Sequence, residues 1–182
     1  DDRPAQAASN DTFMAGDEVS TTGDIAGSSV LAGGRIESAA RVQGKSVLFG
    51  GQIRITGETR DDLYAFGGDI DLEGQVDHNA RVAGGRVTIG RAAQILGTLT
   101  LAGGDVEIDG KVARDVQVAG GRVRIDGAVG GDVDVRAGQL TIGPNARIAG
   151  RLRYRAKESA AFDPAAHIAG AIEVLPDSWS SG

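Results

Sequence analysis

Residues 118–127 read VAGGRVRIDG, and close copies of this phrase recur along most of the chain. The Gly-Gly pair at its centre returns at every seventeenth position, apart from one longer step between Gly84 and Gly103. Periods of this length are typical of repeat proteins, in which each unit buries its apolar face only against its neighbours. The complete pairs are Gly33-Gly34, Gly50-Gly51, Gly67-Gly68, Gly84-Gly85, Gly103-Gly104 and Gly120-Gly121.

Apolar and polar residues alternate on both sides of each pair, as in 116–118 (VQV) and 123–125 (VRI). A period of two with many β-branched residues is typical of strands whose side chains point alternately inward and outward. Alignment on the Gly-Gly pair places the inward residues in columns along the stack. The column expected on the third strand of each turn consists of Ile25, Val42, Val76, Ala93, Val112, Val129 and Ala146.

Turn residues separate the strands and predict three corners in each turn. The Gly-Gly pair would form one corner, where the backbone has a positive φ or packs closely, and Gly57, Gly74, Gly110 and Gly127 a second. Residues tolerant of left-handed backbone, such as Gly44, Asp61-Asp62 and His78-Asn79, would form the third. The sequence therefore predicts an all-β fold. It is a single-stranded parallel β-helix, a triangular β-solenoid of about 17 residues per turn and roughly eight to nine turns.

Charged residues test this register independently. Glu37, Arg54 and Asp71 lie one period apart from one another and alternate in sign, as do Arg41 and Glu58. Residues one turn apart should lie on adjacent parallel strands, so these pairs favour this register over a slipped one.

Composition limits the function classes. The 182 residues carry a net charge of -6, which argues against nucleic acid and anionic membranes as electrostatic partners. The chain contains no cysteine and no phosphate-binding loop, and we expect no catalytic residue, cofactor or metal. We divide it into a flexible leader (1–12), a solenoid domain (13–174) and a tail (175–182).

The phrases VAGGRVRIDG (118–127) and IGPNARIAG (142–150) resemble the bactofilin or polymer-forming cytoskeletal family over about residues 13–174. The resemblance implies a right-handed triangular β-helix that joins end to end into nonpolar filaments without nucleotide. Such filaments are scaffolds for cell shape and for envelope-associated or membrane proteins. The polar start at Asp1 favours an exported member, periplasmic or envelope-associated, with a cytoplasmic membrane-associated location as the alternative.

A solenoid's terminal turns expose strand edges and part of the core, so its ends are candidate self-association sites. The candidate residues are Phe13 and Met14 at one end and Phe162, Ile168 and Ile172 at the other. Phe49, Tyr64 and Phe66 form a candidate partner-binding patch on the body of the rod, because Phe49 and Phe66 are one period apart.

Other interpretations remain open. A scaffold or adhesin-like spacer would bind partners through its faces without polymerising. A hexapeptide-repeat acyltransferase would need a catalytic base, for which His78 and His167 are the available histidines, and both fit a structural role better. Calcium-binding repeats are disfavoured by the length of the period. Asp61-Asp62 with Asp77 could bind a cation weakly, but Arg60 and Lys45 nearby favour charge pairing instead.

Overall fold

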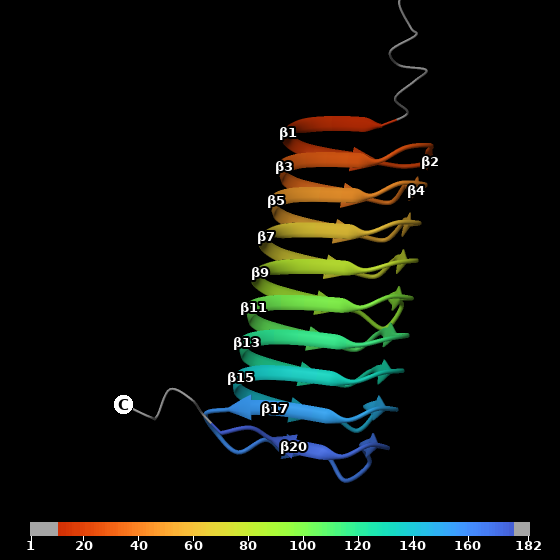
Figure 1. The fold of residues 1–182 in the computed structure, drawn as a ribbon. Helices are drawn as coiled ribbons and strands as arrows, with labels where there is room; N and C mark the ends of the chain where they lie inside the picture. The colour runs from red at the N-terminus through yellow and green to blue at the C-terminus, as the bar shows by residue number, and fades with distance from the viewer. Residues whose placement is uncertain (1–10, 177–182) are drawn as a thin grey trace, which may run out of the picture.

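The computed structural model describes residues 11–176. Within this range the chain is a stack of strands with no helix, and each turn up to β16 contributes one long strand and one short strand (Figure 1). The long strands are β1 (Thr12–Thr21), β3 (Ser29–Ser38), β5 (Ser46–Ile55), β7 (Leu63–Leu72), β9 (Ala80–Ile89), β11 (Leu99–Ile108), β13 (Val116–Ile125), β15 (Val133–Ile142), β17 (Leu152–Ala156) and β20 (Ile172–Val174). The short strands are β2 (Asp24–Ile25), β4 (Arg41–Val42), β6 (Glu58–Thr59), β8 (Gln75–Val76), β10 (Gln94–Ile95), β12 (Lys111–Val112), β14 (Ala128–Val129), β16 (Arg147–Ile148), β18 (Ala161–Phe162) and β19 (His167–Ile168).

The long strands follow one another in one sheet, from β1 to β20, and the short strands from β2 to β19 form a second sheet, except that β18 pairs with β15 of the first. Each strand pairs in parallel with the strand one turn away, so that Ile53 lies opposite Ile36 on one side and Ile70 on the other. The predicted β-solenoid is therefore confirmed, with one period of the sequence in each turn. It has about ten turns rather than eight to nine, because the degenerate repeats after Ile142 continue the stack as β17 and β20.

The Gly-Gly pair lies inside the long strand. Strand pairing continues through the first glycine, as between Gly84 and Gly103, and skips only the second before resuming at Arg86 and Asp105. Of the described residues only Gly23 has a positive φ, so the left-handed backbone expected at the third corner is wrong. The Gly-Gly pair was expected to have either a positive φ or close packing, and close packing is confirmed: a Cβ at Gly103 would lie 2.6 Å from the carbonyl oxygen of Gly84.

The inward columns form one continuous apolar core along the stack. Val, Ile and Leu fill it, and Leu31, Leu48, Ile89 and Ile108 have no exposed surface. Because every turn packs on the turn before and after it, interior turns are covered on both sides whereas terminal turns are not.

The long turns contain a two-residue insertion before the short strand. The register places Ile95 opposite Val76 and Val112, and Ile148 opposite Val129, so these isoleucines occupy the third-strand column. The assignment of Ala93 and Ala146 to this column was wrong. Each alanine is buried in the core as expected, but it closes a tight turn before the short strand, with its N–H donating to the carbonyl of Gly90 or Gly143, respectively, at 3.1 and 3.2 Å.

The predicted charge ladder has the expected register: Arg54 lies opposite Glu37 and Asp71. Of the predicted pairs named above, all among the described residues, Arg41 and Glu58 come close enough for an ion pair, with Nε and Oε2 3.3 Å apart. Such exposed pairs contribute a few tenths of a kcal/mol each, roughly, so the ladder specifies register more than it adds stability.

Candidate functional site

The C-terminal end of the stack, formed by β18, β19 and β20, exposes side chains that belong to the columns of the core. Phe162 lies on Ile142, Ile168 on Ile148, Ile172 on Leu152 and Val174 on Tyr154. Ile172 is 49% exposed and Val174 65%, whereas the residues beneath them are buried. Phe162 also packs against Tyr154, with ring centroids 6.0 Å apart. The structure thus brings all three candidate residues of this end together and adds Val174, which the sequence reading missed.

The first turn presents a complete ten-residue strand, β1, with one edge unpaired among the described residues. Met14 lies in an inward column on Leu31 and is 42% exposed, as expected for a residue at the end of the core. Phe13 pairs with Val30, in a column that points outward. Of the two candidate residues here, Met14 therefore lies at the end of the stack and Phe13 on its side.

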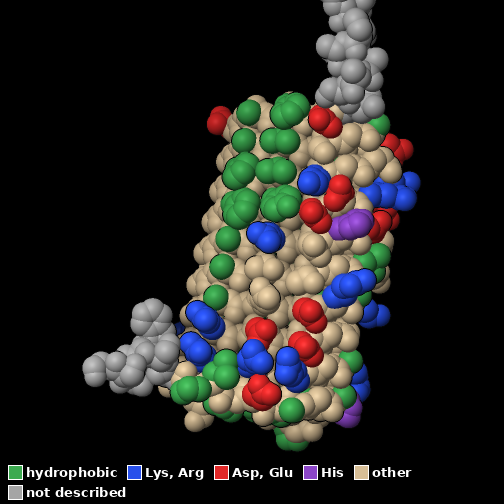
Figure 2. Space-filling model, viewed as in Figure 1, with side chains coloured by type: hydrophobic (Ala, Val, Ile, Leu, Met, Phe, Trp, Pro, Cys, Tyr) green, Lys and Arg blue, Asp and Glu red, His purple; other side chains and the backbone are tan. Residues whose placement is uncertain are grey.

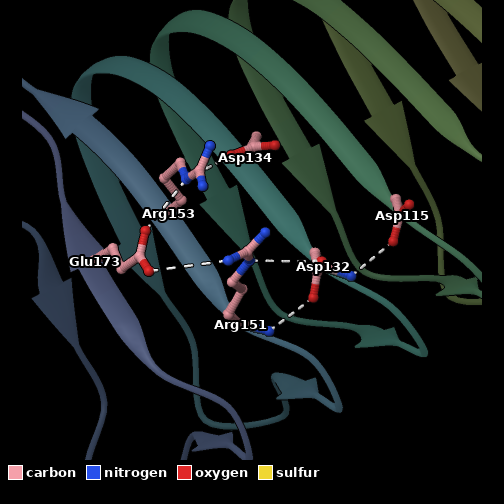
Figure 3. Close-up of polar contacts among 6 residues, drawn as sticks. All are labelled: Asp115, Asp132, Asp134, Arg151, Arg153 and Glu173. Carbon is pink, nitrogen blue, oxygen red and sulfur yellow. Dashed lines mark hydrogen bonds and ion pairs between the residues drawn. The ribbon is translucent and has the colours of Figure 1, made fainter.

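Two arginines hold the last turn on the turn before it (Figure 3). Arg153 of β17 donates from Nε to Glu173 of β20 at 3.3 Å, and Arg151 approaches the same carboxylate at 4.0 Å. The same two side chains reach back to the preceding turn, where Arg151 lies 3.7 Å from Asp132, just before β15, and Arg153 lies 3.8 Å from Asp134 of β15. This ion-pair network links three successive turns at the end where core residues are exposed.

An apolar stripe runs along the outer face of the first four long strands. Its two columns are Phe13, Val30, Val47 and Tyr64, and Ala15, Ala32, Phe49 and Phe66. The rings of Phe49 and Phe66 stack with centroids 5.5 Å apart, and Tyr64 stands on the same strand as Phe66. Figure 2 shows the stripe as a green band over the upper turns, beyond which charged side chains appear. The predicted patch is therefore assembled, and it is part of a larger surface.

A second apolar surface, which the sequence reading missed, lies on the short-strand sheet. A groove of about 600 Å³ follows β10, β12, β14, β16 and β19. One side consists of residues that directly follow the short strands: Leu96, Ala113, Gly130, Ala149 and Ala169. Lys111 and Arg147 line the other side. We call this surface the alanine groove; the small residues that directly follow β12, β14, β16 and β19 were its signal in the sequence.

A ladder of side-chain hydrogen bonds fixes the corner before each long strand. Asp115 accepts from the N–H of Asp132 at 2.8 Å, and Asp132 accepts from the N–H of Arg151 at 3.0 Å (Figure 3). Asp62 and Asn79 do the same in turns nearer the N-terminus, for the N–H groups of Asn79 and Thr98. A short acceptor side chain at this position thus satisfies a backbone N–H that strand pairing leaves open.

The acidic corner brings together Asp61, Asp62 and His78, whose possible ligand atoms lie within 4.8 Å of one another. Asp77, which the sequence reading grouped with the aspartates, instead accepts from Nε2 of Gln75 at 2.9 Å. Asp61 accepts from the N–H of Asp62 at 2.8 Å. In this rung of the hydrogen-bond ladder the residue one turn earlier is Lys45, whose side chain cannot accept a hydrogen bond. The carboxylates of Asp61 and Asp62 therefore both act as hydrogen-bond acceptors that stabilise the corner.

Asp126 is a buried carboxylate beside the insertion turn of residues 143–146. It accepts from the N–H of Asn145 at 2.8 Å and from its Nδ2 at 3.1 Å, and Arg124 lies 3.6 Å away. Burial raises the pKa of Asp126, but the Asn145 hydrogen bonds and the charges of Arg124 and Arg91 outweigh it, so the pKa is lowered. In contrast, burial and the nearby charge of Asp109 raise the pKa of Glu107.

The two histidines lie far apart along the chain, His78 at an exposed corner and His167 exposed on β19. No protein-family model matches the chain, and neither does any curated protein or solved structure. The described part of the chain contains no helix of the length and apolarity needed to cross a bilayer. The ends and faces of the solenoid are thus the features from which a function can be argued.

Proposed function

We propose that this chain is a structural protein that joins end to end through its terminal turns, building filaments that act as a cell-envelope scaffold. The observation that carries the proposal is the exposed core at the last turn, formed by Phe162, Ile168, Ile172 and Val174. Covering such a surface with a second molecule removes apolar area from water, at about 25 cal/mol per Å².

Backbone geometry supports the same proposal. Strand β1 offers a full row of N–H and C=O groups at its free edge within the described range. Natural sheets that remain monomeric usually cover or interrupt such edges, and β1 carries no proline. An incoming strand would extend the stack by the hydrogen bonding that already joins its turns. The resemblance to the bactofilin family in VAGGRVRIDG and IGPNARIAG also favours a polymer.

The test changes the exposed core residues to carboxylates. We expect Ile172→Glu with Val174→Glu to raise the concentration needed for assembly at least tenfold, because the joint would bury two unpaired charges. Negative-stain microscopy and sedimentation of the full chain measure the change. Ala102→Glu is the matched control, since Ala102 is exposed on the side of β11 and should leave assembly intact. Monomeric rods for the unchanged protein at high concentration would contradict the proposal.

A further inference from the structure

We propose that the apolar stripe of one copy binds side by side in the alanine groove of a second copy. The two surfaces lie on different sheets and in different halves of the stack: the stripe on β1 to β7 and the groove on β10 to β19. The contact is independent of end joining, because it uses the sides of the rod.

The shapes of the two surfaces are complementary. Phe49 and Phe66 project from the stripe, with 47% and 38% of their surface exposed. The groove is hollow because Ala113, Gly130 and Ala149 leave room beside the short strands. The large rings of the stripe thus fit the space that small residues leave in the groove. Such complementary shapes give good packing at an interface.

Both surfaces have the same repeat. The stripe places a side chain on each of four turns of the long-strand sheet, and the groove has one small residue on each of four turns of the short-strand sheet, with Leu96 in this position on the fifth. Strands in a sheet are about 4.8 Å apart, so the stripe and the four turns with small residues are each about 14 Å long. Side chains with this spacing can enter the groove in register over those four turns.

Charges around the surfaces favour the same pairing. The groove is flanked by Lys111 and Arg147, and no carboxylate lines it. The corner next to the stripe carries Asp11, Asp61 and Asp62 against Lys45. A stripe docked on another stripe would instead bring three carboxylates of each copy together with Lys45 as the one basic residue in each of these corners.

The size of the contact predicts its strength. A strip about 14 Å long is too short to bury the roughly 800 Å² per partner of a stable complex, so a single contact is weak. Because stripe and groove are different surfaces, each bound copy still offers one of each, and the array stays open. In an end-joined filament many such contacts would act together and bind filaments laterally.

Cross-linking provides the first test, since the chain has no cysteine of its own. We expect mixed Ala32→Cys and Ala149→Cys proteins to form a disulfide-linked dimer under copper-phenanthroline oxidation. Ala32 lies in the stripe and Ala149 in the groove. The matched pair is Ala119→Cys with Ala149→Cys, because Ala119 is exposed on β13 outside both surfaces; it should cross-link at least tenfold more slowly.

Complementation provides the second test, by sedimentation of proteins that also carry Ile172→Glu and Val174→Glu to remove end joining. Neither a stripe variant, Phe49→Ser with Phe66→Ser, nor a groove variant, Ala149→Arg, should self-associate. At high protein concentration their equal mixture should form more dimer than either variant alone, because each supplies the surface that the other lacks. The proposal would be overturned in favour of a symmetric contact or a different partner by any of three results. These are failure of the mixture to dimerise, self-linking of Ala32→Cys alone, and cross-linking of the test pair at the control rate. End joining is scored separately by the end variants.

Discussion

At the scale of single residues, the two glycines of each pair are not equivalent. A Cβ at Gly84 would lie 2.5 Å from the carbonyl oxygen of Gly67, closer than real side chains approach, whereas one at Gly85 would lie 3.2 Å from that of Gly68. Neither glycine has a positive φ, so alanine is unstrained in backbone conformation at both. A difference in stability between alanine variants at Gly84 and Gly85 therefore reports on the contact between turns.

We expect Gly84→Ala to destabilise the fold by about 1–3 kcal/mol, because the next turn must move away. Gly85→Ala should be near neutral, since a small shift is offset by the lower entropy of the unfolded chain, worth about 0.4–1 kcal/mol. Urea unfolding measures both. Equal losses in the two variants would show that the first glycine is not specially constrained. Ala137 occupies the same column on β15, at the end of the regular run of pairs, where an alanine is accommodated.

Asp126 makes stability depend on pH in a definite direction. Its folded-state pKa is lowered, so its carboxylate contributes stability above the usual aspartate pKa of about 4, which is lost as pH falls through the folded value. We expect Asp126→Asn to lower stability by about 1–2 kcal/mol at pH 7, and the gap to the parent protein to close in acid. Thermal unfolding from pH 7 to pH 2 measures it. Asp105→Asn, exposed on β11, is the control; a gap that persists unchanged in acid would contradict the assignment.

At the scale of strands and turns, the features that recur in every turn could be predicted from the sequence, whereas those that differ from one turn to another were missed. The repeat period and the alternation around Val123 predict strands, register and core, because one face of every strand must be buried. The same reasoning misplaced Ala93 and Ala146. Alanine fits both a small core site and a tight turn, so the position of a two-residue insertion cannot be read from apolarity alone.

The corners show a second limit of sequence reasoning. Asp61-Asp62 and Asn79 were correctly expected at a corner, but for left-handed backbone. Their role is instead that Asp62 and Asn79, like Asp115, accept a hydrogen bond from an N–H of the following turn. That role depends on a neighbour one full turn away along the chain, which becomes visible only once the turns are stacked. The alanine groove was missed for the same reason, since small residues form a surface only in register.

At the scale of the whole molecule, the outer face changes character along its length. The two outward columns that form the stripe on β1 to β7 continue as Arg81 and Ala83 on β9, and as Asp134 and Arg136 on β15. The core beneath them does not change in this way. A repeated core therefore supports a graded surface, and in such a stack the stability of each turn depends mainly on its nearest neighbours.

This dependence predicts that the last turn can be loosened by itself. Glu173 holds β20 through Arg151 and Arg153, whereas Glu37 is an exposed carboxylate on β3 between two complete turns. We expect Glu173→Ala to speed hydrogen exchange about threefold at the N–H groups of Leu152 and Leu175, which bond Ala171 and Tyr154 across the last turns. Strands β9 and β11 should stay as protected as before, because their neighbours are unchanged. Glu37→Ala should leave exchange at β20 unaffected. An equal increase along the whole stack would mean that the molecule unfolds as one unit and that its exposed end is not the weak point.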